Sequence, residues 1–352
     1  MRSMVEGALA CLPRSARRLE WPVQPCRDCR SMFTVFVAIA VPILVAMLAV
    51  ALWFAWSSWL IARRARRAVP PVGGFVEIDG ERIHYVERGE GRPILMIHGL
   101  GGTLHHLRRP LMEEFGDGFR LIAMDRPGSG YSTRAAGRDG RLSEQARFVA
   151  RFIDALGLDR PLLVGHSLGG AIALAVALDF PHKISGLALI SPLTHTGEPI
   201  RPEFRILAIR SPLVRRLVAA TIAMPMSVKN APKVMEFVFG PQQPPADYAV
   251  AGGALSALRP SHFYASSTDF VALEHELPRL EGRYGELVMP VGILYGTEDR
   301  VLDHRRQGLA MEGKVAGLDL EIVEGIGHMP QYAVTERVVA FIRRIAQKAF
   351  AA

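Results

Sequence analysis

Short apolar runs alternate with amphipathic stretches along most of the chain after residue 70. The apolar runs predict strands over 92–99, 119–125, 160–167, 184–192, 291–299 and 318–328. A further pair of strands is predicted over 75–89, with a turn at Asp79-Gly80. Because uninterrupted apolar strands are typically buried on both faces, this pattern predicts an α/β fold with a mostly parallel sheet flanked by helices.

Three segments have helical periodicity, namely 142–157, 168–180 and 333–350. In the first of them Phe148 and Phe152 fall on one helical face. The interval 193–285 breaks the alternation of strands and helices, and it is rich in Pro, Met and Phe. We interpret 193–285 as an inserted helical cap, so the α/β core is predicted over 73–192 and 286–352.

The longest apolar segment, 31–62, contains no charged residue. A helix crosses the hydrocarbon layer with about 20 residues, so this segment is long enough to span a bilayer with some tilt. Trp53, Trp56 and Trp59 gather near its end, as interfacial aromatic residues do. A buried core helix or the apolar region of a signal peptide would be much shorter. We therefore predict a transmembrane helix over 31–62, followed by a basic linker over 63–72.

Arginines flank the predicted span on both sides. The cluster at 63–67 favours a cytoplasmic location for the C-terminal part, whereas the arginines before the span oppose that orientation. We predict that residues 1–30 are disordered and hypothesise that translation begins at Met32, which would remove the opposing charges. The globular part is then expected on the cytoplasmic side of a single-pass membrane protein.

The formal net charge of +8 raises the question of a nucleic-acid partner. Residues 1–70 carry ten arginines and three acidic residues, so the remaining chain has a net charge of only +1. The basic charge belongs to the N-terminal segment, and no nucleic-acid partner is predicted. The three cysteines, Cys11, Cys26 and Cys29, lie in the same segment, and their single C-x-x-C pair lacks both a βαβ context and a second pair. We therefore expect no metal and no cofactor.

One serine stands between glycines where the strand 160–167 meets the helix 168–180. The stretch Gly165-His166-Ser167-Leu168-Gly169 fits the G-x-S-x-G motif, which exposes a nucleophilic serine on a sharp strand-to-helix turn. The motif also occurs by chance, but here its structural context is present. Gly165 and Gly169 are needed because the turn is strained and the helix must pack closely past it. We therefore predict Ser167 as the nucleophile.

A serine hydroxyl needs a base to take its proton and an acid to orient that base. His328 follows the last predicted strand and is the predicted base. Asp299 ends the preceding strand and is the predicted acid, with Glu298 and Asp303 as alternatives. The chain order Ser167, Asp299, His328 is the order expected after a G-x-S-x-G motif.

Acyl transfer also needs backbone N–H groups that hold the developing oxyanion. The amide of Leu168, directly after the nucleophile, is one candidate. The loop that begins at His98 is expected to supply the other from Leu100, with Gly99 letting the backbone reach the substrate oxygen. His98 itself is expected to shape this loop rather than accept a proton.

Five stretches resemble the landmarks of the α/β-hydrolase fold superfamily in order and spacing: HGLGG, DRPGSGYS, GHSLGG, GTEDRV and GIGHMPQ. The resemblance extends from about residue 73 to 350 and implies the α/β-hydrolase fold and serine hydrolase activity. Ser167 stands where haloalkane dehalogenases and epoxide hydrolases have aspartate, which argues against both activities. With its single N-terminal span, the chain is similar to membrane-anchored monoacylglycerol lipase-like esterases.

We therefore predict a membrane-anchored serine hydrolase that cleaves a carboxylic ester through an acyl-enzyme. The predicted partners are a small-molecule or lipid-like ester with an apolar acyl chain, and the bilayer. Hydrolysis of a carbon–carbon bond in ring-cleavage products is the alternative among enzymes. A non-catalytic membrane binding protein with the same fold is the alternative outside enzymes.

Overall fold

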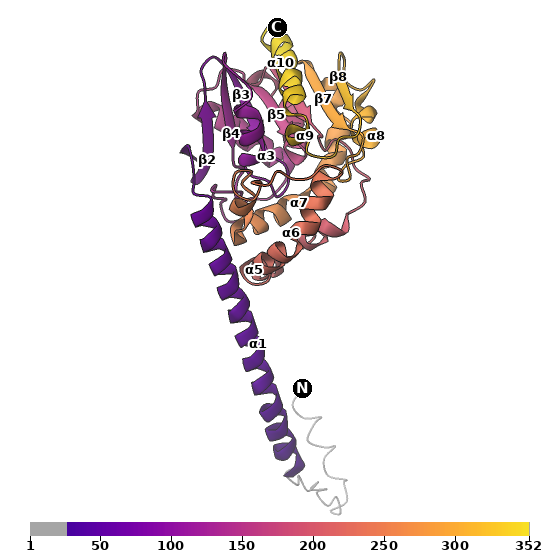
Figure 1. Cartoon of the computed structure of the whole chain (residues 1–352). Helices are drawn as coiled ribbons and strands as arrows, with labels where there is room; N and C mark the ends of the chain where they lie inside the picture. The colour runs from indigo at the N-terminus through magenta and orange to yellow at the C-terminus, as the bar shows by residue number, and fades with distance from the viewer. Residues whose placement is uncertain (1–26, 352) are drawn as a thin grey trace, which may run out of the picture. The chain divides into compact units, whose positions relative to one another are not determined.

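An eight-stranded sheet lies at the centre of the computed structural model, which describes residues 27–351 (Figure 1). The strands are β1 (Gly74–Ile78), β2 (Glu81–Arg88), β3 (Arg92–Ile97), β4 (Phe119–Met124), β5 (Leu162–His166), β6 (Gly186–Ile190), β7 (Val291–Gly296) and β8 (Asp319–Val323). Their order in the sheet is β1-β2-β4-β3-β5-β6-β7-β8. β2 is antiparallel to β1 and β4, and the strands from β4 to β8 are parallel. The predicted mostly parallel sheet is confirmed.

Helices cover both faces of this sheet because its central strands are apolar on both sides. In β3, Leu95 and Ile97 pack with α3 (Leu142–Ala155) and α4 (Leu168–Asp179), whereas Ile94 and Met96 pack on the opposite face with α10 (Thr335–Ala351). Short helices α2 (His105–Leu107), α8 (His304–Gln307) and α9 (Pro330–Ala333) lie in the loops. The alternation along β3 therefore divides the core into two layers.

The predicted helical insertion is present between β6 and β7. It contains α5 (Pro212–Ala220), α6 (Ala223–Phe239) and α7 (Pro260–Glu281). Its boundaries at 193 and 285 stay a prediction, because Leu277 and Leu280 of α7 pack into the same apolar cluster as the sheet. α7 thus belongs partly to the cap and partly to the core.

The N-terminal helix α1 (Arg27–Ala68) includes all of the predicted span 31–62. It is a candidate transmembrane helix, since Ser31–Ala68 is long and apolar enough to cross a membrane and contains an 18-residue window with a mean hydropathy of 3.0. The predicted linker 63–72 differs from the structure, where its first six residues are helical. Arginine and alanine favour a helix, and Pro70-Pro71 end it only afterwards. The predicted disordered segment 1–30 lies outside the described residues except for its last four, which begin α1.

Residues 51–351 belong to one compact unit, and residues 27–50 belong to another. Within the larger unit, Ala62 and Ala65 near the end of α1 are buried, as is Val69 just after it. The carbonyl oxygens of Arg66 and Val69 accept hydrogen bonds from the Tyr131 hydroxyl. The last turns of α1 are therefore fixed to the globular part.

Candidate active site

Ser167 occupies a strained turn between β5 and α4. Its φ of 54° and ψ of −121° are rare for a residue with a side chain, and such strain persists only where surrounding contacts hold it. The N–H of Ser167 donates to the carbonyl of Ile190 at 3.1 Å, and its own carbonyl accepts from Gly170 and Leu193 at 2.9 and 3.0 Å. These three bonds to neighbouring elements fix the backbone on either side of the hydroxyl.

The two glycines of the motif lie where no side chain fits. A Cβ at Gly165 would lie 2.6 Å from the carbonyl oxygen of Gly169, and a Cβ at Gly169 would lie 2.1 Å from that of Ile97. Gly99, in the loop after β3, is equally close to the turn, since a Cβ there would lie 2.9 Å from the Ser167 Cβ. The three glycines let β3, β5 and α4 meet directly below the hydroxyl.

His328 and Asp299 lie against each other at the carboxyl ends of β8 and β7. The Nδ1–H of His328 donates to Oδ2 of Asp299 at 2.7 Å, and both side chains are buried. The other carboxylate oxygen, Oδ1, accepts the N–H groups of Val301 and Leu302 at 2.8 and 2.9 Å. The carboxylate is thus held from one side by the backbone and points its second oxygen at the imidazole.

The two alternative acids take other positions. Asp303 caps the start of α8, where its carboxylate accepts the N–H of Arg305 at 2.8 Å. Glu298 has its backbone N–H bonded to the carbonyl of Ile326 at 2.9 Å and is exposed. Among these three carboxylates, the structure brings Asp299 to His328.

His166, the residue before Ser167, connects the turn to His328. Burial, helped by the nearby His328, lowers the pKa of His166 well below its usual value, so the ring is neutral. Its Nε2–H donates to the carbonyl oxygen of His328 at 2.9 Å, and the two rings are 4.9 Å apart between centroids. The loop that holds His328 is therefore tied to the turn that holds Ser167.

A buried arginine braces the loop that contains Gly99 and Leu100. Arg126, two residues after the end of β4, donates to the carbonyl oxygens of His98 and Gly99, both at 3.1 Å. It also forms an ion pair with Asp269 of α7 at 2.6 Å, and both side chains are almost completely buried. This pair joins the loop to the cap, and sequence reasoning did not find it.

His98 shapes this loop, as expected from its position. Burial and the adjacent Arg126 cation lower the pKa of His98 well below its usual value, so the ring is neutral. The neutral ring uses both nitrogens, because Nδ1–H donates to the carbonyl of Gly99 at 2.9 Å and Nε2 accepts the N–H of Arg126 at 3.0 Å. His98 therefore has no free nitrogen with which to accept a proton.

The two predicted oxyanion donors belong to residues that line the same cavity as Ser167. Leu168 is the first residue of α4, and Leu100 lies in the braced loop. Neither N–H donates to a protein acceptor within residues 27–351. The positive end of the α4 dipole also points toward this region, which favours negative charge there.

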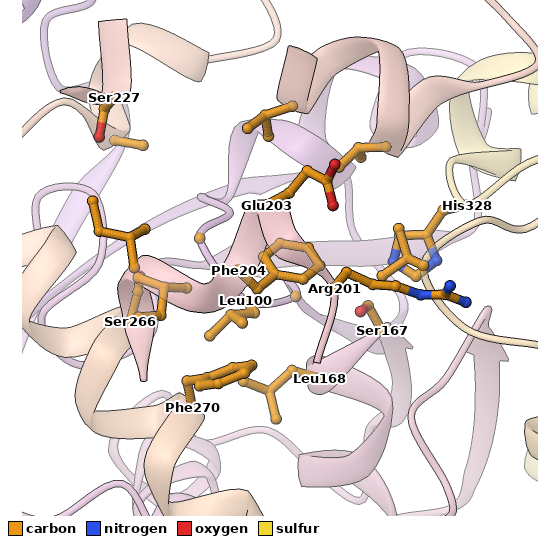
Figure 2. A pocket seen from close by; sticks show the side chains of 18 of the residues that line it. Leu100, Ser167, Leu168, Arg201, Glu203, Phe204, Ser227, Ser266, Phe270 and His328 are labelled. Carbon is orange, nitrogen blue, oxygen red and sulfur yellow. The ribbon is translucent and has the colours of Figure 1, made fainter. Parts of the chain in front are cut away.

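Ser167 and His328 line one end of a cavity of about 1050 Å³ (Figure 2). Figure 2 shows Phe204 and Phe270 along its middle, and Ser227 and Ser266 at the other end. Leu100 and Leu168 border the same space. Across the part of the chain that the structure describes, no group of three or more potential metal ligands gathers.

Comparison with known proteins identifies the family. A family model described as alpha/beta hydrolase fold matches residues 92–333. The chain belongs to the alpha/beta hydrolase fold family. This match covers the sheet from β3 to β8 together with Ser167, Asp299 and His328.

The relatives that match parts of the chain differ in the activities that their names state. A dihydrolipoyllysine-residue acetyltransferase component of an acetoin cleaving system from Cupriavidus necator is 40% identical over 121 residues, which is 34% of this chain and 32% of that protein. Haloalkane dehalogenase 2 of Mycobacterium tuberculosis is 42% identical over 108 residues, which is 31% of this chain and 37% of the dehalogenase. The chain thus matches about a third of the length of these curated relatives.

One solved structure matches over more of the chain. It is a membrane phospholipase A, described as a bacterial virulence factor. Its sequence is 26% identical, and the match covers 88% of this chain and 98% of that one with a TM-score of 0.63. The match extends beyond residues 92–333, to a larger share of the chain than the family model covers.

Proposed function

We propose that this alpha/beta hydrolase is a membrane-anchored serine hydrolase that cleaves carboxylic esters of apolar acyl chains. The observation that carries the proposal is the 2.7 Å hydrogen bond between His328 and Asp299 at the same end of the cavity as the strained Ser167. A carboxylate on Nδ1 holds the proton there and leaves Nε2 able to accept one. A serine on a sharp turn with such an imidazole beside it suits acyl transfer.

In the proposed reaction, the Ser167 hydroxyl attacks the ester carbonyl carbon while His328 Nε2 takes its proton. The N–H groups of Leu100 and Leu168 hold the oxyanion. The tetrahedral intermediate collapses, His328 returns the proton to the leaving alcohol, and an acyl-enzyme remains. Water then attacks the acyl-enzyme with His328 again acting as base, which releases the carboxylic acid and restores the serine. Asp299 keeps the imidazole oriented throughout and stays ionised.

The lining and the volume of the cavity support a substrate whose apolar acyl chain is bound inside it. Phe204, Phe270 and Leu168 line it, and its volume of about 1050 Å³ is at the upper end for small-molecule sites. Ser167 in place of an aspartate argues against the chemistry of the related haloalkane dehalogenase. The membrane phospholipase A with the same fold supports a lipid-like ester.

Membrane anchoring through α1 is part of the proposal. The uncharged run within Ser31–Ala68 and the exposed tryptophans near its end support it. We place the globular part on the cytoplasmic side because the arginines at 63–67 follow the span. Protease added outside intact spheroplasts should then leave the globular part whole, and its digestion would reverse the orientation.

A fluorophosphonate probe tests the hydrolase. The full chain in detergent should be labelled, and Ser167→Ala should abolish labelling without changing thermal unfolding. Hydrolysis of p-nitrophenyl esters and monoacylglycerols of graded chain length then identifies the substrate. No labelling of the intact protein would favour the non-catalytic alternative, and labelling with turnover only of a ring-cleavage product would favour carbon–carbon bond hydrolysis.

A further inference from the structure

Apolar side chains are exposed along one face of α5 and in the turn that follows it. Leu213, Val214 and Leu217 are 77%, 50% and 63% exposed, and Ile222 in the turn is 38% exposed. Single exposed apolar residues are ordinary, but residues three and four apart on one helix are neighbours and form a continuous surface. We call these four residues the α5 patch. A continuous apolar surface of this kind is a candidate interaction site.

The end of α1 fixes where the α5 patch lies. The Ser58 hydroxyl donates to the carbonyl oxygen of Thr221, the residue before Ile222, and Ser58 is almost fully buried by this contact. One turn further along, Ile61 packs against the cluster formed by Ala219, Ala223, Met224 and Phe263. The α5–α6 turn therefore sits beside residues 58–61 of α1.

Those residues of α1 carry the marks of a membrane interface. Trp56 and Trp59, on either side of Ser58, are 55% and 49% exposed, and tryptophan gathers at the boundary between acyl chains and headgroups. The Arg63 guanidinium lies over the Trp59 ring, 5.1 Å from its centroid, where the charged part of the helix begins. Through Ser58, the α5–α6 turn is at the level of this boundary.

Exposed cations lie on the same helix as the α5 patch and on the helix that follows it. Arg216 lies within α5 next to Leu217, and Lys229 and Lys233 lie on α6. An apolar helix face bordered by cations is typical of helices that lie in the plane of the membrane, where phosphate groups attract the cations. The charge therefore favours a lipid surface over a second protein.

The α5 patch also adjoins the cavity. Met224, Met226 and Ser227 of α6 line the cavity, and Val228 lines it while being 47% exposed. Ser227 lies at the end of the cavity far from Ser167 (Figure 2). The wall of the cavity thus reaches the surface in the first turns of α6, directly after the α5 patch.

We propose that the α5 patch inserts into the lipid interface beside α1, so that the cavity receives its acyl-chain substrate from the bilayer. This inference rests on the proposed membrane anchoring. α1 holds the cap at the interface, and the α5 patch adds a second apolar contact that orients the first turns of α6 toward the acyl chains.

Site-specific quenching in vesicles tests the insertion directly. The full chain, with Cys11, Cys26 and Cys29 replaced by serine, is reconstituted in vesicles of phosphatidylcholine and phosphatidylglycerol. An environment-sensitive fluorophore is attached through Leu217→Cys and, as the matched control, through Val288→Cys, an 85% exposed position just before β7. Lipids with a nitroxide high on the acyl chain should quench the fluorophore at 217 at least about threefold more than at 288.

Equal quenching at the two positions would overturn the inference. Blue-shifted emission at 217 that lipid quenchers do not reach, and that grows with the protein-to-lipid ratio, would also overturn it by assigning the patch to a second copy. Extraction at alkaline pH tests α1 separately: if the unmodified chain is released from the vesicles, the proposed anchoring itself fails. If the chain stays bound and 217 is not quenched, only the α5 inference fails.

An activity measurement gives a second test. The double substitution Leu213→Ser and Leu217→Ser should lower hydrolysis of a long-chain monoacyl ester embedded in vesicles by about tenfold. Hydrolysis of a water-soluble short-chain ester should stay unchanged, because neither residue lines the cavity. A parallel loss on both esters, or no loss on either, would contradict the inference.

Discussion

The replacement Asp299→Asn isolates the orienting role of the carboxylate, because it preserves size and removes one acceptor. The backbone contacts decide which way the new amide points. Oδ1 accepts the N–H groups of Val301 and Leu302, so in the variant the carbonyl oxygen must keep that position. The amide NH2 is then left facing Nδ1 of His328, where a carboxylate oxygen accepted a proton at 2.7 Å.

An NH2 donor forces Nδ1 of His328 to become the acceptor. The ring proton moves to Nε2, which can no longer take the proton of Ser167. We therefore expect kcat to fall roughly 10⁴-fold, which corresponds to about 5.5 kcal/mol in the activation barrier. The rate of fluorophosphonate labelling should fall in parallel, because both reactions need the same proton acceptor.

The assay compares kcat for a p-nitrophenyl ester in detergent, using the full chain. Asp303→Asn is the matched control, because asparagine caps a helix as well as aspartate and α8 should be undisturbed. Both variants should unfold within a few degrees of the unmodified protein. Near-normal kcat in Asp299→Asn, with a large loss in Asp303→Asn or Glu298→Gln, would refute the reasoning and move the role to that acid.

Three further predictions concern the turn, the buried arginine and the buried histidines. Gly169→Ala should lower the free energy of unfolding by about 3 kcal/mol, because its Cβ would lie 2.1 Å from the Ile97 carbonyl oxygen. Thermal unfolding measures this loss, with Gly282→Ala as the control because its Cβ would meet nothing within 4 Å. Arg126→Met should lower the free energy of unfolding by about 3 kcal/mol or more. The substitution removes one of the two cations that pair with the buried Asp269, and it removes the donor to the carbonyl oxygens of His98 and Gly99. An unchanged unfolding temperature would contradict this prediction. Burial lowers the pKa of His105 and His262 to about 4, against 6.5 when unfolded, so the unfolded state binds more protons. The free energy of unfolding should therefore fall as the pH drops from 6.5 toward 4, by about 1.4 kcal/mol per pH unit for each group. Equal unfolding temperatures at pH 7 and pH 5 would exclude this pH dependence.

The strands of the sheet could be predicted because each is a short apolar run bounded by turn residues. The predicted run 160–167 and the observed β5 (Leu162–His166) differ by two residues at one end and one at the other. The turn at Ser167 was predictable for the same reason, since only glycine fits at positions 165 and 169. Local pattern suffices wherever a residue's neighbours in sequence are also its neighbours in space.

The sequence predicted Asp299 as the acid but left Glu298 and Asp303 as alternatives. All three follow the same strand, and their spacing does not show which side chain turns toward His328. The direction of Asp299 depends on two backbone N–H groups, those of Val301 and Leu302, whose positions follow from how the chain leaves β7. The roles of these residues in catalysis stay predictions.

Contacts between the cap and the core were beyond sequence reasoning for a different reason. Asp269 lies 143 positions after Arg126, and nothing near either residue indicates that they meet. The helical continuation of α1 through the arginines was also missed, because charge at 63–67 was interpreted as a linker although arginine favours a helix. The ion pair was missed because its two residues are distant in sequence, whereas the end of α1 was missed because a local propensity was overlooked.

The ion pair between Arg126 and Asp269 has a consequence for how the cavity is filled. Separating two buried charges costs several kcal/mol, so α7 is firmly joined to the loop that carries Gly99 and Leu100. No ion pair joins α5 or α6 to the core within residues 27–351. Arg215, the buried cation of α5, bonds instead to Ser267 and Thr268 of α7. Since α7 is fixed and α5 and α6 are held by weaker contacts, we expect the proposed acyl-chain substrate to enter at lowest cost on the α5–α6 side, which also carries the α5 patch.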